Sequence, residues 1–203
     1  MPKIVHHDQR REAIARAAWR TIARAGLEAS TVRAIARDAG CSTGVLQHYF
    51  PDKDALLLHA LRLVTRQTGG RMAERANGRT GLAALRAVLR EALPLDAASR
   101  LEWRIWLAFW SRAVHDAGLA AEQRRRYRDW RAVIRALLRD AQRRGEVSAH
   151  LDPAGEADAL VAFIDGLGLG AALEPARLSP ARQRAMVDRY LRRLSVVRGA
   201  ESR

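Results

Sequence analysis

The chain has 203 residues and a formal net charge of +14, and 48% of its residues are hydrophobic. That apolar content is enough for a buried core, and the absence of any run of about eighteen apolar residues predicts no membrane span. Cys41 is the only cysteine, which excludes a disulfide framework and a cysteine-based zinc site. The lone thiol and the lack of an apolar N-terminal leader fit a cytoplasmic protein.

The positive charge is not concentrated in the N-terminal part of the chain. Residues 1–53 hold nine basic and five acidic side chains, a net +4 of the total +14. The densest basic run, Arg124–Arg126, lies much later and is interpreted as a solvated helix face. Charge alone therefore favours a nucleic-acid partner only weakly, and stronger evidence has to come from motifs.

Almost every segment has the apolar period of a helix, and none alternates like a strand, so the sequence predicts an all-α protein of about nine helices. Ser30, then Ser42 or Thr43, then Asp52 are the expected caps of the second, third and fourth helices. The pair Gly69-Gly70 predicts a kink in the fourth. The expected helices cover residues 8–25, 31–39, 43–50, 52 to the mid-seventies, 81–93, 97–117, 119–144, 153–174 and 180–197.

The helices expected over 31–39 and 43–50 match the packing demands of a helix-turn-helix. Such a unit needs apolar residues facing inward, a small residue where the helices cross and a glycine in the turn. All seven positions carry suitable residues: Ile35, Ala36, Ala39, Gly40, Cys41, Leu46 and Tyr49. The first three helices therefore form a compact N-terminal domain, and the rest of the chain forms a larger helical bundle.

The second helix of this motif divides into two sides at 100° per residue. Leu46 and Phe50 share the inner side with Tyr49, whereas Gln47 and His48 face outward and are good partners for base edges in a major groove. Other residues around them suit the close approach of a duplex and contacts to its phosphates, and these are Thr43, Gly44, Lys53 and the hydroxyl of Tyr49. The stretch predicts a double-stranded DNA partner.

Residues 10–60 resemble the DNA-binding domain of TetR-type (tetracycline-repressor family) transcription regulators. The matching text is AIARAAWRTIARAGLEASTVRAIARDAGCSTGVLQHYFPDKDALLLHAL, and its tyrosine–phenylalanine pair, two spacer residues and lysine before leucines are specific to that family. The resemblance implies a nine-helix homodimer that represses from an inverted-repeat operator and is released by a small ligand. It also implies a DNA-binding domain at 1–53 and a ligand-binding and dimerisation domain at 54–203, connected by the fourth helix.

The family's functional positions carry over residue by residue. Its base-reading helix falls on Thr43, Gly44, Val45, Gln47 and His48. Its phosphate contacts fall on Arg33, Tyr49 and Lys53. The QHYF motif and the helical bundle that follows it resemble the subgroup that includes the choline-responsive repressor of the betaine pathway. This resemblance does not predict that the present chain binds the same ligand.

Three tryptophans share one face of the helix expected over 97–117, namely Trp103, Trp106 and Trp110. Such a stripe forms either ordinary core or the lining of a ligand pocket. A pocket of indoles suits an apolar, aromatic or quaternary-amine effector, the last through cation–π contact. Trp130 and Phe163 are further ligand candidates from neighbouring helices.

Small residues recur every four positions in the eighth helix, at Ala162, Gly166 and Gly170. Glycine disfavours a helix by about 1 kcal/mol against alanine, which close packing against another helix would offset. The resemblance places the dimer interface on the last two helices, where it adds Val187, Tyr190 and Leu194. Packing within one chain is the alternative.

No pattern of a catalytic site, a metal site, a phosphate loop or a dinucleotide site occurs, so we predict neither an enzyme nor a cofactor. Two alternatives to a ligand-released repressor stay open. One is a helical small-molecule-binding protein whose DNA head has no function. The other is a regulator that activates transcription or responds to no ligand. The sequence names neither the effector nor the operator.

Overall fold

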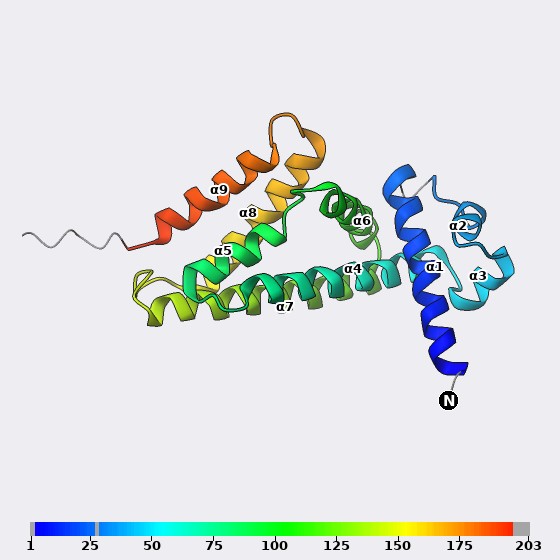
Figure 1. The fold of residues 1–203 in the computed structure, drawn as a ribbon, viewed down its shortest axis with the longest axis horizontal. Coiled ribbons are helices and arrows are strands. Elements are labelled where there is room, and N and C mark those ends of the chain that lie inside the picture. Colours follow the sequence, from blue (N-terminus) through cyan, green and yellow to red (C-terminus); the bar gives the residue numbers. More distant parts are fainter. Residues whose placement is uncertain (1–2, 27–28, 197–203) are drawn as a thin grey trace, which may run out of the picture. The chain divides into compact units, whose positions relative to one another are not determined.

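The computed structural model is helical throughout and describes residues 3–26 and 29–196, with the backbone alone for residues 3–8 (Figure 1). Nine helices lie within these residues, which confirms the predicted all-α fold class. They are α1 (Lys3–Ala25), α2 (Val32–Asp38), α3 (Thr43–Tyr49), α4 (Lys53–Ala76), α5 (Gly81–Glu91), α6 (Ala97–Ala113), α7 (Ala117–Arg143), α8 (Pro153–Leu173) and α9 (Pro180–Leu194). None of the described helices is long and apolar enough to cross a membrane.

Local capping groups set most of the helix starts where the sequence predicts them. Ser42 caps α3, and Ser179 caps α9. The start of α2 differs, because its N-cap is Thr31, whose Oγ1 accepts a hydrogen bond from the Ala34 amide at 3.1 Å. Ser30, the expected cap, is buried and donates its hydroxyl to the Gly26 carbonyl at 2.6 Å.

Helix α4 runs without a break from Lys53 to Ala76, through Gly69 and Gly70. Both glycines keep a negative φ, and a Cβ added at either would meet nothing within 4 Å. Neither a turn nor a close contact therefore requires them, and their role as a bending point stays a prediction.

The described chain divides into two compact units. The first contains the residues up to Thr68 together with Ala97–Gln123, and the second contains Gly69–Asp96 and the residues from Arg124 onward. Helix α6 thus packs with the N-terminal helices. The predicted functional boundary at residue 53 falls inside the first unit and stays a prediction.

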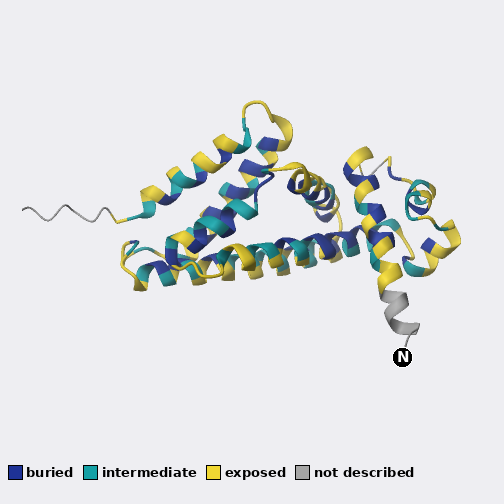
Figure 2. Cartoon of the chain, viewed as in Figure 1, coloured by how far each residue is buried: buried dark blue, intermediate teal, exposed yellow. Residues whose placement is uncertain are grey.

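Apolar side chains of α1 to α4 and α6 form the core of the first unit, where buried positions line the inner faces of the helices (Figure 2). Its largest fully buried side chains include Phe50, Phe109, Ile14, Ile22, Ile35, Leu46, Leu57 and Leu61. Two arginines of α6 add polar links. Arg104 donates to the Ala23 carbonyl at 2.5 Å, and Arg112 pairs with Asp54 of α4 at 2.5 Å.

The second unit has its own apolar core, made by α5, α7, α8 and α9. Its buried members include Leu85, Leu89, Ile134, Leu138, Leu160, Ile164, Val187 and Leu191. Asp188 links α9 to α5. Its carboxylate accepts hydrogen bonds from Arg86 at 3.1 Å and from Arg90 at 2.6 Å, both on α5. Each unit is therefore held by a separate set of buried contacts.

Candidate nucleic-acid interface

The turn between α2 and α3 has the geometry that a helix-turn-helix requires. Gly40 adopts a φ of +61°, a conformation that side chains with a Cβ disfavour. The Cys41 amide donates to the Ala36 carbonyl at 3.0 Å and closes the end of α2. Arg10 of α1 donates to the Gly40 carbonyl at 3.3 Å, so the first helix also holds the turn.

Helix α3 is braced from its inner side. Leu46 is 2% exposed and Phe50 is 1% exposed, and both lie in the core of the first unit. The Ser42 hydroxyl accepts a hydrogen bond from the Val45 amide at 3.2 Å, which leaves the hydroxyl of Thr43 out of the cap. The helix is thus fixed by buried contacts on one side and by a cap at its start.

The other side of α3 faces solvent, as the sequence predicts. All five predicted base-reading residues are exposed, namely Thr43, Gly44, Val45, Gln47 and His48. Tyr49 is half-buried at the edge, where its ring meets the His48 ring edge-on with centroids 5.5 Å apart. Lys53 is also half-buried and begins α4. The structure therefore brings these seven residues together around one short helix.

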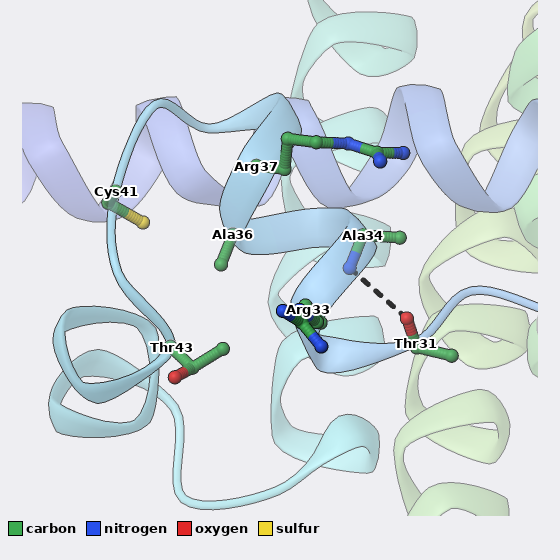
Figure 3. Close-up of a pocket in the computed structure, with 7 residues that line it drawn as sticks. All are labelled: Thr31, Arg33, Ala34, Ala36, Arg37, Cys41 and Thr43. Carbon is green, nitrogen blue, oxygen red and sulfur yellow. Dashed lines mark hydrogen bonds between the residues drawn. The ribbon is translucent and has the colours of Figure 1, made fainter.

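A groove of about 610 Å³ lies between α2 and α3. Figure 3 shows its lining, which consists of Thr31, Arg33, Ala34, Ala36, Arg37, Cys41 and Thr43. Arg33 and Thr43, both predicted to contact DNA, share this groove. Arg37, one turn after Arg33 on α2, also lines the groove.

Polar contacts behind the surface tie α2 to α1. Asp38 of α2 accepts hydrogen bonds from the Thr21 hydroxyl at 2.9 Å and from Arg24 at 2.6 Å. The Thr21 hydrogen bond, followed by the charge of Arg24, lowers the pKa of the Asp38 carboxyl. The carboxylate is thus kept charged and holds the two helices together.

His59 of α4 lies behind α3, with its ring centroid 5.4 Å from that of Phe50. Its Nε2 atom is buried and has no hydrogen-bond partner in the described structure. Burial, followed by the nearby charges of Arg11 and Arg66, lowers the pKa of His59. The neutral ring therefore fits this position better than its protonated form does.

The predicted ligand residues divide between the two units. Trp103 and Trp110 of α6 meet edge-on at 5.8 Å, and Trp106 lies 6.5 Å from Trp110, all within the first unit. Trp130 and Phe163 belong to the second unit and pack against its core. The structure gathers the three tryptophans as predicted from their spacing, while a ligand role for any of the five stays a prediction.

The predicted dimer residues also divide. Ala162 and Gly166 of α8 are exposed, and a Cβ on Gly166 would meet nothing within 4 Å. Val187 is fully buried in the core of its own unit, and its assignment to a dimer interface stays a prediction. A Cβ on Gly170 would lie 2.6 Å from the Leu178 side chain of the same chain, so close packing at Gly170 is internal.

The two remaining dimer candidates, on α9, have contacts inside the chain. Tyr190 donates its hydroxyl hydrogen to Glu156 at 2.7 Å, and its ring lies tilted against that of Phe163 with the centroids 4.8 Å apart. Leu194 packs partly buried against the same core. Their assignment to a dimer interface is therefore not needed to explain them.

Sequence reasoning missed two exposed leucines on α8. Leu169 is 43% exposed and Leu173 is 72% exposed. At 100° per residue they fall on the same side of α8 as Ala162 and Gly166. We call these four residues the α8 stripe.

The braced helix-turn-helix and its exposed polar edge define a DNA-binding regulator of transcription. Residues 14–60 match the family model of bacterial regulatory proteins of the tetR family, and residues 82–196 match that of the BetI-type transcriptional repressor C-terminal region. The chain belongs to the TetR family of transcriptional regulators. Both models describe regulators and not enzymes, in agreement with the predicted non-enzymatic function.

Individual relatives agree with this assignment. The chain is 31% identical over 197 residues to the HTH-type transcriptional regulator PksA of Bacillus subtilis, an alignment that covers 97% of this chain and 95% of that protein. It is 32% identical over 197 residues to the HTH-type transcriptional regulator BetI 2 of Chromohalobacter salexigens, covering 96% and 92%. A transcriptional regulator from Saccharomonospora viridis, solved in complex with choline, matches with a TM-score of 0.87 at 26% identity, covering 94% of this chain and 100% of that one.

Proposed function

We propose that the protein is a ligand-responsive repressor that binds an inverted-repeat operator as a homodimer in the cytoplasm. The observation that carries the proposal is the division of α3 into a buried side and an exposed polar side. Leu46 and Phe50 fix the helix, while Gln47 and His48 are exposed and aligned along it. Side chains held in this way can read base edges without a further folding step.

Each residue around α3 has a role suited to its chemistry. Gln47 and His48 donate to and accept from base edges, and Val45, 39% exposed, suits contact with a thymine methyl group. Arg33 and Lys53 supply positive charge for phosphates, and the hydroxyl of Tyr49 can donate a hydrogen bond to a phosphate oxygen. Base contacts would set the sequence preference, and phosphate contacts would set affinity and its dependence on salt.

The α8 stripe supports the homodimer. Its four residues are apolar or glycine and carry no charge, so a second copy of the stripe could cover them around a two-fold axis. Gly166 would allow the two helices to approach closely, because it has no side chain. A two-fold dimer would bind half-sites that lie one helical turn of DNA, about 34–36 Å, or a multiple of it apart, which explains an inverted repeat.

The effector is proposed to be an organic cation such as a quaternary amine. The tryptophan cluster of α6 suits cation–π contact, and the S. viridis relative was solved with choline. The same helix places Ile105 and Phe109 in the core of the first unit and links Arg104 to α1. A shift of α6 on binding would therefore reach the DNA-binding helices directly, and release from the operator would follow.

Replacement of phosphate-contacting residues tests the proposal against a helical small-molecule-binding protein with a non-functional DNA head. Each lost phosphate contact should reduce the slope of log affinity against log salt concentration by about 1. We therefore expect Lys53→Ala to weaken binding to duplex DNA and to lower this slope. Unchanged affinity and slope in this variant and in Tyr49→Phe would support the rival function.

The dimer is tested by placing charge on the α8 stripe. Leu169→Asp and Leu173→Asp together should convert the dimer to a monomer in sedimentation experiments, because the stripe would have to bury two carboxylates. Val133→Asp is the matched control, since Val133 is 46% exposed on α7. A dimer that survives the double substitution would contradict the proposed interface.

The ligand response is tested by titration with choline as the probe. We expect the intrinsic fluorescence of the tryptophans to change and operator affinity to fall. Trp106→Phe should weaken both effects, because phenylalanine is a poorer cation–π partner than tryptophan. Choline binding without any loss of operator affinity would favour an activating or ligand-independent regulator.

A further inference from the structure

Most of the positive charge lies in the unit that lacks the helix-turn-helix. Residues 69–96 and 124–203, which make up the second unit, hold 22 basic and 13 acidic side chains, a net +9 of the total +14. The DNA-binding motif therefore accounts for only a minor part of the positive charge of the chain.

Four exposed arginines of α7 form a single row along that helix. They are Arg124, Arg128, Arg135 and Arg139, and we call them the α7 arginine row. At 100° per residue they lie within about 60° of one another, over a length of about 22 Å. No ion pair or hydrogen bond within the described residues engages any of their guanidinium groups.

Other arginines of the same helical region have partners inside the chain. Arg131 lies between members of the row, but it pairs with Asp158 of α8 and places its guanidinium over the Tyr127 ring at 5.2 Å. Arg144, just after α7, pairs with Asp140 at 3.0 Å. A solvated helix face usually mixes charges of both signs, whereas like charges three or four residues apart repel each other. The row is therefore a repulsive arrangement that a polyanion would relieve.

The spacing of the row favours a polymer of negative charges over a small anion. Successive members lie about 6 Å or about 10 Å apart along the helix axis, too far for one phosphate ion to reach them all. A strand of duplex DNA carries one phosphate about every 3.4 Å along its axis, so about six phosphates pass along the length of the row. Arginine also suits phosphate because its guanidinium can bind two oxygens at once.

The row lacks the apolar residues that a protein or a membrane partner would need. Its exposed neighbours on α7 are Ala132 and Ala136, and the exposed Val133 lies on nearly the opposite side of the helix. The core of a protein interface is depleted of charged residues, and a helix on a membrane surface needs a broad apolar face. Interfaces with nucleic acids are much more positively charged.

We propose that the α7 arginine row binds the phosphodiester backbone of duplex DNA, as a second contact that is independent of sequence and separate from α3. The inference goes beyond the proposed function, because the row belongs to the unit without the helix-turn-helix. DNA is the expected polyanion, since a protein bound to an operator meets neighbouring DNA at a high effective concentration. A protein held at its operator would thus bridge to a second stretch of duplex.

The test uses the full chain saturated with unlabelled operator duplex, which occupies α3. Fluorescence anisotropy then follows the binding of a labelled duplex of unrelated sequence at several salt concentrations. The wild-type protein should bind this second duplex at low salt, with a slope of log affinity against log salt concentration of about −3 to −4, as expected for four phosphate contacts. No binding of the second duplex at low salt would overturn the inference.

Replacement of the four row arginines by glutamine should abolish binding of the second duplex, whereas their replacement by lysine should retain it, since the charge remains. The matched control replaces four ion-paired arginines of the same unit by glutamine and changes the net charge equally. These are Arg125, Arg143, Arg144 and Arg177. The control should still bind the second duplex. Equal losses in the row variant and the control would overturn a specific role of the row.

Competition identifies the polyanion. Unlabelled duplex should displace the labelled duplex better than poly-glutamate or single-stranded RNA at the same total charge. Displacement by poly-glutamate as good as that by duplex would indicate an acidic protein partner and overturn the inference, and better displacement by RNA would also overturn it. Protein that selects no operator contradicts the proposed function alone. Binding of the unrelated duplex, compared between the row variant and the control, then still tests the row.

Discussion

Helices α3 and α8 both combine a buried side with an exposed side, but their exposed sides differ in chemistry. On α3 the exposed side carries Gln47 and His48, which contribute nothing to the core. On α8 it is the apolar stripe, whereas polar and small residues elsewhere on that helix have partners inside the chain. Exposed polar residues are ordinary on a solvated helix, so Gln47 and His48 indicate an outside partner only because they stand on the second helix of a helix-turn-helix. Apolar and small residues do so only when the structure shows them unpaired.

The largest effect that this comparison predicts is a loss of stability at Phe50, with no such loss on the opposite side of α3. Phe50 is 1% exposed, so Phe50→Ala should lower the free energy of unfolding by about 3–5 kcal/mol. Gln47→Ala should change it by less than about 0.5 kcal/mol. Urea denaturation measures both. Similar values for the two variants would mean that α3 is not divided in this way.

The next prediction is that Tyr190 of α9 stabilises the fold of its own chain and not the dimer. Its hydroxyl donates to Glu156, so Tyr190→Phe should lower the free energy of unfolding by about 1–2 kcal/mol. Sedimentation should show an unchanged dimer dissociation constant. A weaker dimer with normal stability would instead place Tyr190 at the interface, as the sequence predicted.

The dependence of the free energy of unfolding on acid pH tests the packing of His59 behind α3. Because the folded state lowers the pKa of His59 below its ordinary 6.5, the unfolded chain takes up a proton first as the pH falls. The stability associated with the neutral ring is therefore complete above pH 6.5 and is lost as the pH falls below it. The slope from this one group is at most about 1.4 kcal/mol per pH unit. We expect His59→Leu to lack this contribution to the slope. Urea denaturation at several pH values between neutral and acid measures it.

Gly44 gives a small effect on stability and separates folding from binding. A Cβ there would have only the Ser42 hydroxyl oxygen nearby, at 3.9 Å, so the free protein has room for it. Gly44→Ala should raise the free energy of unfolding by up to about 1 kcal/mol, because alanine favours a helix. Affinity for the operator should fall, since the methyl group keeps the backbone away from the duplex. Unchanged affinity would show that α3 does not approach DNA at Gly44.

Local signals were enough to predict the helices and the exposed edge of α3. Helix starts depend on neighbouring residues, and a buried or exposed side follows from spacing along one helix. The start of α2 shows the limit, because Ser30 and Thr31 are both good caps. The hydrogen bond from the Ser30 hydroxyl to the Gly26 carbonyl engages Ser30, and Thr31 is the residue that caps α2.

Long-range packing explains what the sequence could not provide. The grouping of α6 with the N-terminal helices depends on contacts such as that of Arg104 with Ala23, which no local period encodes. Val187 and Gly170 were assigned to a dimer because apolar and small residues serve internal and intermolecular packing equally well.

We propose above all that the exposed edge of α3 reads the sequence of duplex DNA. The most direct test is the selection of fragments from a random duplex pool by the purified protein and by its Gln47→Ala, His48→Ala double variant. The wild-type protein should recover one inverted repeat, and the variant should still bind DNA but lose preference at the contacted positions, worth about 1–3 kcal/mol for each base contact. Recovery of no preferred sequence by the wild type at low salt, or of the same repeat by the variant, would contradict the claim.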